Sequence, residues 1–107
     1  MTYLSLSMCR KRINDIDEKI LRLLAQRAEL ALQVARRKHA QNLPIPDAER
    51  ERDILARLTR LNPGPLSQSA VARLFQAILN ESRMLQIEQM EQLEASDTSM
   101  AGRESIQ

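Results

Sequence analysis

One long stretch without a helix breaker constrains this chain most. Neither Pro nor Gly occurs before Pro44. Apolar residues recur through this stretch at three- and four-residue steps: Ile13, Ile16, Ile20, Leu23, Leu24, Leu30, Ala31 and Val34. The spacing predicts one amphipathic helix that starts between Ser5 and Met8, with Ser7 as its cap. About 32 residues at ~1.5 Å each would span roughly 50 Å, so we expect this helix to cross into a partner chain.

Two further helices are predicted after this stretch. The segment "NLPIPD" interrupts the pattern, because each Pro removes a backbone donor and disfavours helix at the residue before it. Asp47 is a good cap for a second helix, which the segment "NPGP" ends, and Ser67 or Ser69 caps a third. The periodicity is lost after Leu93. We therefore predict an all-α domain of one long, one short and one medium helix over 1–95, followed by a disordered tail over 96–107.

The composition favours an oligomer and excludes several kinds of site. A chain of 107 residues with only Tyr3 and Phe75 as aromatic residues can build only a thin core, so we expect a homodimer. A net charge of +2 gives no support for nucleic acid or a membrane as a partner. One cysteine (Cys9) permits no internal disulfide, and one histidine (His39) gives no pair of metal ligands. We expect a cytoplasmic protein without a metal or cofactor.

Polar residues occupy positions on the apolar faces of all three predicted helices. Arg27 lies four residues after Leu23 in the first helix, and Lys38 follows eleven residues later, within roughly 20° of the same direction. The other inward-facing polar residues are Asp47, Glu51, Ser82 and Gln86. Each could have a structural role: an arginine can extend to water, Glu51 can pair with a basic residue, and Ser or Gln can bond locally.

Two inward-facing cations need compensation, because removing each from water costs roughly several kcal/mol. Glu51 is the one inward-facing acid near enough to help Arg27 and Lys38. A guanidinium binds a carboxylate through two parallel hydrogen bonds, so the missing partner should be a small molecule with several negative charges. Arg10 lies seventeen residues before Arg27, about 25 Å along the helix, and so would reach such a pocket only in another chain whose helix runs antiparallel.

Three segments resemble the all-helical chorismate mutases, which are intertwined homodimers. They are "RKRINDIDEKILRLLAQRAELALQVARRK", "PIPDAERERDIL" and "LFQAILNESRMLQ". The resemblance covers Arg10 to about Gln89. The resemblance implies that the chain converts chorismate to prephenate, a rearrangement that breaks one C–O bond and forms one C–C bond. It also implies that no cofactor takes part.

The resemblance assigns the two substrate carboxylates and the ether oxygen to five residues. Arg27, helped by Ser82, would bind the ring carboxylate, and Arg10 of the other chain would bind the enolpyruvyl carboxylate. Lys38 would contact that carboxylate and the ether oxygen, to which Gln86 would also donate.

The ring end of the substrate is assigned to the second helix. Asp47, through its backbone, and Glu51 would hold the ring hydroxyl, and Arg50 would lie near the ring carboxylate. Catalytic roles thus go to Lys38, Gln86 and Glu51.

Other functions stay open at this point. Isochorismate pyruvate lyases of the same fold tend to lack an acid at the position of Glu51, which favours a mutase. A mutase for 4-amino-4-deoxychorismate is compatible with Asp47 and Glu51, since both accept hydrogen bonds from an amine. A helical dimerisation or nucleic-acid-binding module is the alternative from another class, but two aromatic residues give little support for base stacking.

Overall fold

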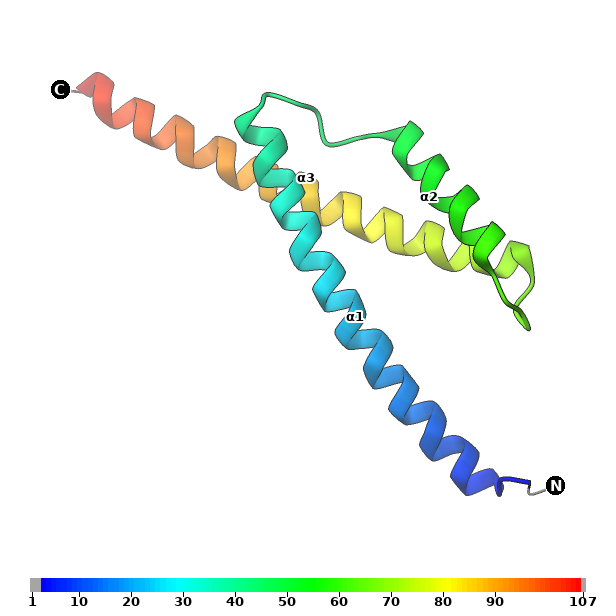
Figure 1. Ribbon diagram of the computed structural model, residues 1–107. Coiled ribbons are helices and arrows are strands. Elements are labelled where there is room, and N and C mark those ends of the chain that lie inside the picture. The colour runs from blue at the N-terminus through cyan, green and yellow to red at the C-terminus, as the bar shows by residue number, and fades with distance from the viewer. Residues whose placement is uncertain (1–2, 107) are drawn as a thin grey trace. The chain divides into compact units, whose positions relative to one another are not determined.

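Three α-helices make up the protein in the computed structural model, which describes residues 3–106 and the side chains of residues 3–98. They are α1 (Leu6–Ala40), α2 (Ala48–Leu61) and α3 (Gln68–Ile106), shown in Figure 1. The described residues contain no strand. The all-α class predicted from the sequence is therefore confirmed.

Local hydrogen bonds fix both ends of α1. The helix starts inside the predicted interval, but its cap is Ser5 and not Ser7, since the Met8 N–H donates to Ser5 Oγ at 3.1 Å. At the other end Asn42 has a φ of 57°, and the Leu43 N–H donates to Lys38 O at 2.8 Å. This is the left-handed end motif that Asn tolerates better than most residues. The motif reverses the chain and fixes the backbone at Lys38.

The amino-terminal caps of α2 and α3 follow the sequence prediction. Asp47 caps α2 by accepting a hydrogen bond from the Arg50 N–H at 3.0 Å. Ser67 caps α3, because its Oγ accepts a hydrogen bond from the Ala70 N–H at 3.0 Å. Between these helices Gly64 has a φ of 74°, a backbone conformation that favours glycine in the short connection.

The chain forms two compact units, of which the first ends at Leu30 and the second begins at Ala31. The second unit therefore holds the last ten residues of α1 together with α2 and α3. Among residues 3–98, the buried apolar residues all lie in it: Ala31, Ala35, Ile45, Ile54, Val71 and Leu79. The described part of the first unit contributes none, so only the second unit has a core of its own.

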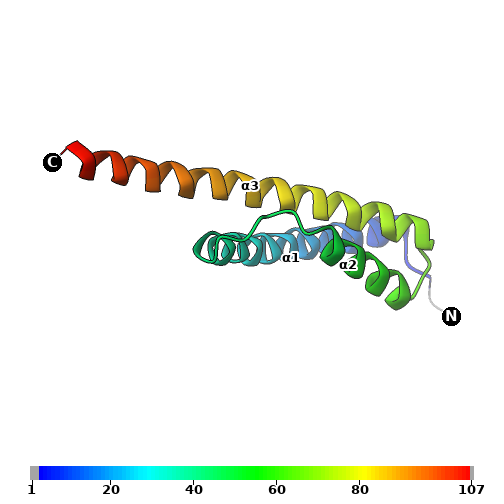
Figure 2. The same cartoon turned by 90° about the horizontal axis from the view of Figure 1, so that it is seen from above.

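Within the second unit α2 packs along α3. The two helices lie side by side in Figure 1 and again in the view from above in Figure 2. The contact buries Ile54 of α2 and Val71 and Leu79 of α3, each of which contributes about 1.5–3 kcal/mol when fully buried. This pairing places the first turn of α2 where its side chains can meet those of α3.

The apolar row of α1 remains exposed over most of its length. Leu23 and Leu30 are each 61% exposed, and Ile13 is 55% exposed. A surface of this kind is costly in water and is typical of helices that pack against another chain. In the described part of the protein no helix is both long enough and apolar enough to cross a membrane.

The carboxyl end is helical as far as the structure describes it. The predicted domain ends at residue 95 and the predicted tail covers 96–107, whereas α3 continues as a helix to Ile106. Local bonds such as that from Thr98 Oγ1 to Glu94 O, at 2.9 Å, accompany the extension. Gln107, the last residue of the predicted tail, lies outside the described residues.

Candidate functional site

Lys38 lies in the last turn of α1, next to the loop that leads to α2. Its ammonium donates a hydrogen bond to Ile45 O at 3.0 Å, and Ile45 is itself buried. The end motif of α1 and the buried loop residue thus fix both ends of this side chain. Because an ammonium group has three N–H donors, two remain for another molecule.

Gln86 joins α3 to the last turns of α1. Its amide Nε2 donates to Ala31 O at 3.0 Å. Ala31 and Ala35 are both buried, and their small side chains leave the α1 backbone accessible to the amide. The second N–H of the Gln86 amide and its carbonyl oxygen have no hydrogen bond among the described residues.

Glu51 is paired with Arg83 of α3, one of the alternatives that the sequence left open. Arg83 Nε donates to Glu51 Oε2 at 3.0 Å, and a terminal guanidinium nitrogen donates to Oε1 at 2.8 Å. These hydrogen bonds hold the pKa of the Glu51 carboxyl below its ordinary value, against partial burial and the nearby Asp47, which act in the opposite direction. Glu51 therefore stays ionised at neutral pH, and each of its oxygens keeps a lone pair for another donor.

Arg83 is a site residue that sequence reasoning missed. It lies four residues after the buried Leu79, so it shares a row of α3 with a core residue, which was the available signal. Its partner Glu51 is 32 residues away on another helix, and that pairing depends on how α2 packs against α3. A third hydrogen bond of Arg83, to Asn80 Oδ1 at 3.0 Å, orients the guanidinium further. Arg83 thus positions the Glu51 carboxylate.

The other predicted site residues of the second unit, Asp47, Arg50 and Ser82, are close in sequence to Glu51 or Gln86. Asp47 and Arg50 are exposed at the start of α2, and Asp47 O accepts a hydrogen bond from the Glu51 N–H at 3.1 Å. Ser82 is half-buried on α3 and directly precedes Arg83, the residue that pairs with Glu51. Helical geometry places Ser82 and Gln86 on one face of α3 because they are four residues apart.

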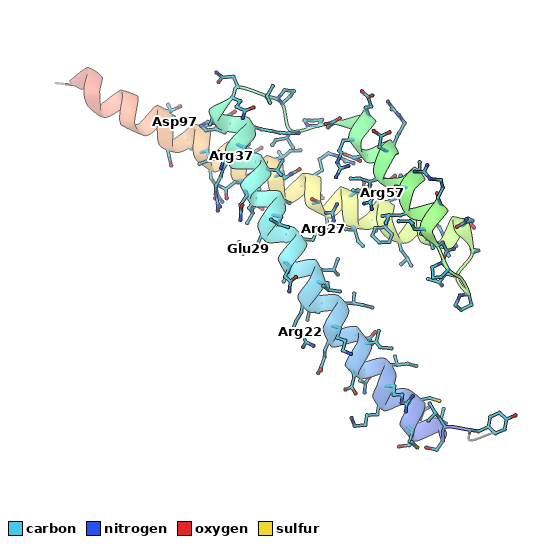
Figure 3. All side chains as sticks on the ribbon, in the orientation of Figure 1. Arg22, Arg27, Glu29, Arg37, Arg57 and Asp97 are labelled. Carbon is cyan, nitrogen blue, oxygen red and sulfur yellow. The ribbon has the colours of Figure 1, made fainter. Side chains whose placement is uncertain are left out.

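Two of the predicted arginines, Arg27 and Arg10, lie in the first unit. Arg27 is half-buried, and none of the ion pairs within the described part of the chain includes it. Figure 3 shows that it projects from the opposite side of α1 to Arg22 and Glu29. Arg10 is exposed near the start of α1. Their predicted roles stay predictions.

An open pocket of roughly 640 Å³ lies at the end of α1. Of the predicted site residues it includes Lys38 alone. Its wall is formed by the loop after α1 and by one side of α3: His39, Asn42, Leu43, Pro44, Ile45, Pro46, Ile87, Met90, Glu91 and Glu94.

The fold and these contacts define an all-helical domain in which each of the three helices provides one anchored polar side chain: Lys38 bonds to Ile45 O, Glu51 to Arg83, and Gln86 to Ala31 O. Residues 9–87 match the family of type II chorismate mutases. The chain belongs to this family.

Similar proteins share both the sequence and the fold. The bifunctional chorismate mutase/prephenate dehydratase of Escherichia coli K12 is 42% identical over 78 residues, which are 72% of this chain and 20% of that protein. The chorismate mutase of Methanocaldococcus jannaschii is 35% identical over 81% of this chain and 89% of that protein. The structure of chorismate mutase (form II) from Thermus thermophilus is 34% identical, with a TM-score of 0.75 over 76% of this chain and 92% of that chain. The chain thus spans a fifth of the length of the bifunctional relatives and most of the length of the others.

Proposed function

We propose that this chain is a chorismate mutase that converts chorismate to prephenate. The observation that carries the proposal is the arrangement of Lys38, Glu51 and Gln86. Each comes from a different helix, each is anchored by a hydrogen bond within the second unit, and each keeps capacity to bind another molecule. Membership in the type II family supports the same activity.

The reaction requires the substrate to adopt a compact shape in which the two carbons that bond are close. Arg27, with Ser82 and Arg50 nearby, binds the ring carboxylate, and Arg10 of a second chain binds the enolpyruvyl carboxylate. Holding both ends selects the compact shape and removes much of the entropic part of the barrier. No group of the protein is required as a nucleophile, because the bonds that form and break all lie within the substrate.

Negative charge grows on the ether oxygen as the C–O bond breaks. Lys38 and Gln86 donate to this oxygen, and both are already fixed by Ile45 O and Ala31 O before the substrate arrives. Preorganised donors of this kind each contribute roughly 10²–10³ in rate. Catalysis is therefore electrostatic and conformational.

The ring hydroxyl is held at the start of α2. Glu51 accepts a hydrogen bond from it with a lone pair that Arg83 leaves open, and the Asp47 backbone provides a second contact. Arg83 holds the carboxylate ionised and in one orientation, so that it only accepts hydrogen bonds. An amine in place of the hydroxyl would also be accepted, which makes 4-amino-4-deoxychorismate the substrate to compare.

The site requires a homodimer. Arg10 lies about 25 Å along α1 from Arg27, beyond the reach of any side chain. Two α1 helices that pair antiparallel across a two-fold axis bring Arg10 of one chain to the Arg27–Lys38 region of the other and cover the exposed apolar row of α1. We place this dimer in the cytoplasm, without nucleic acid or a membrane as a partner.

Incubating the purified protein with chorismate and identifying the product tests the function directly. We expect prephenate, detected after its acid conversion to phenylpyruvate. A parallel reaction with 4-amino-4-deoxychorismate tests the alternative substrate. No consumption of chorismate by a folded, dimeric protein would contradict the proposal.

The pH profile tests the role of Gln86. An amide donates without being protonated, and Glu51 stays ionised above its lowered pKa, so we expect kcat to vary little between about pH 6 and 9. The variant Gln86→Glu should differ, because its carboxyl donates only when protonated and activity should fall as pH rises. If wild type and variant show the same profile, Gln86 is not the donor.

A further inference from the structure

The ion pair between Glu51 and Arg83 lies at the ring end of the proposed site. Each oxygen of the carboxylate accepts a hydrogen bond from the guanidinium, at 3.0 and 2.8 Å. The side chain of Glu51 is 21% exposed and that of Arg83 is 33% exposed, so the pair is partly shielded from water. Partly buried charges are screened by salt much less than exposed ones. The charge of Arg83 therefore acts on any group that binds to Glu51.

Two amide side chains of α3 hold Arg83 in this position. A terminal guanidinium nitrogen donates to Asn80 Oδ1 at 3.0 Å, and the same oxygen accepts a hydrogen bond from Gln76 Nε2 at 3.0 Å. The amide of Asn80 is thus oriented with its oxygen toward the guanidinium. Because this amide is neutral, it orients Arg83 without competing for its charge.

The other charged groups near Glu51 do little to change this balance. Arg83 is its one ion-pair partner in the described part of the chain, and the pKa of Glu51 stays below its ordinary value although Asp47 acts in the opposite direction. Asp47 is exposed, and its carboxylate caps α2, where the positive end of the helix dipole offsets an acid. Arg50 is exposed as well. The ring end of the site therefore carries little net negative charge.

A hydroxyl and an amine differ in charge at this position, although both can donate a hydrogen bond to Glu51. An aliphatic amine is protonated at neutral pH, as the side chain of lysine is. Moving an ammonium from water into a partly buried site is costly unless a net negative charge compensates. The pair of Glu51 and Arg83 has no net charge, and the guanidinium repels a second cation. A neutral hydroxyl meets neither cost.

We propose that Arg83 determines the specificity of this site by neutralising Glu51, which favours the ring hydroxyl of chorismate over the ammonium that 4-amino-4-deoxychorismate carries in its place. This inference rests on the proposed function, in which Glu51 holds the ring substituent. Arg83 acts through Glu51 and by repulsion, so it need not touch the substrate. Repulsion of the wrong ligand is a common source of specificity. Without Arg83, Glu51 would attract the ammonium as an unpaired carboxylate.

Kinetics with both substrates tests the proposal in wild type, Arg83→Gln and Arg83→Lys. We expect the ratio of kcat/KM for chorismate to kcat/KM for the amine to fall at least about tenfold in Arg83→Gln, because a like-charge contact is removed. Most of the change should be a lower KM for the amine. Comparing this ratio between variants cancels the intrinsic difference in reactivity. If the amine binds without reacting, its inhibition constant against chorismate replaces its KM.

Arg83→Lys separates charge from geometry. It keeps the positive charge but loses the two parallel hydrogen bonds, so we expect it to keep most of the wild-type preference even if turnover of both substrates falls. A residue that only supported the shape of Glu51 would give the same ratio in all three proteins.

A second variant adds charge without removing Arg83. Asn80→Asp keeps the shape of an exposed side chain and its acceptor oxygen, so the fold should be retained, but it gives Arg83 a second acid to neutralise. We expect the ratio to move in the same direction as in Arg83→Gln, by a smaller factor. Arg73→Gln is the matched control for Arg83→Gln, because Arg73 is an exposed cation of α3 outside every ion pair among the described residues. Its ratio should equal that of wild type.

The outcomes separate this inference from the proposed function. A lower ratio in Arg83→Gln and Asn80→Asp, with Arg83→Lys and Arg73→Gln near wild type, supports the role of Arg83. A wild type that forms prephenate, together with an unchanged ratio in Arg83→Gln and Asn80→Asp, overturns this inference alone. A folded, dimeric wild type that forms no prephenate overturns both this inference and the proposed function.

Discussion

Replacing Lys38 or Arg27 by alanine is expected to lower kcat/KM for chorismate at least about a hundredfold. Lys38→Ala removes the cation that meets the developing charge on the ether oxygen, so most of its loss should appear in kcat. Arg27→Ala removes a bidentate partner of the ring carboxylate, and we expect both a higher KM and a lower kcat. Initial rates over a range of chorismate concentrations measure both parameters.

Matched controls come from the same helix. Arg22 projects from the other side of α1 to Arg27, and Arg37 is an exposed cation next to Lys38 (Figure 3). Arg22→Ala and Arg37→Ala change the net charge by the same amount and should keep nearly normal turnover. If a control variant lost as much kcat/KM as the variant it is matched to, the overall charge of the helix, and not the proposed contact, would explain the loss.

The Lys38 variant also needs a structural check, because Lys38 bonds to Ile45 O. This hydrogen bond is partly buried and its donor is a charged ammonium, so its loss should cost about 1.5–3 kcal/mol of stability. Thermal unfolding followed by circular dichroism should show the same helical content in variant and wild type. Near-normal turnover in Lys38→Ala or Arg27→Ala would contradict the site.

The fold could be predicted from the sequence where local physics decides it. Apolar spacing and the Pro residues near Ile45 place the helices, and Asp47 and Ser67 cap α2 and α3 as their side chains allow. At the start of α1, two serines lie two residues apart, and either could cap. The chain uses Ser5 and not Ser7, a choice that apolar spacing alone does not decide.

The site was only partly predictable, because its contacts join distant segments. Periodicity identified Glu51 and Gln86 as inward-facing, but it could not show that Glu51 pairs with Arg83 or that Gln86 bonds to Ala31 O. Both contacts depend on how α3 packs against the other two helices. The pair with Arg83 also shows that Glu51 has a cationic partner within the chain, which the sequence had left as one alternative.

The exposed apolar row of α1 favours pairing with a second copy of the chain. A chain whose described core lies wholly after residue 30 has little to bury the earlier apolar residues except another copy. If α1 pairs in this way, each site uses Arg27 and Lys38 from one chain and Arg10 from the other. A variant without Arg10 and a variant without Lys38 should then form mixed dimers in which one site is complete.

Mixing two nearly inactive variants, Arg10→Ala and Lys38→Ala, is expected to restore about a quarter of wild-type activity. Random refolding makes half of the dimers mixed, and each mixed dimer has one site with both residues intact and one with neither. The activity is measured per chain after joint refolding at equal concentrations. Mixing Arg27→Ala with Lys38→Ala is the control, and it should restore nothing, because both residues serve the same site from the same chain. Failure of the first mixture, in a protein shown to exchange subunits, would mean that Arg10 does not act across the dimer.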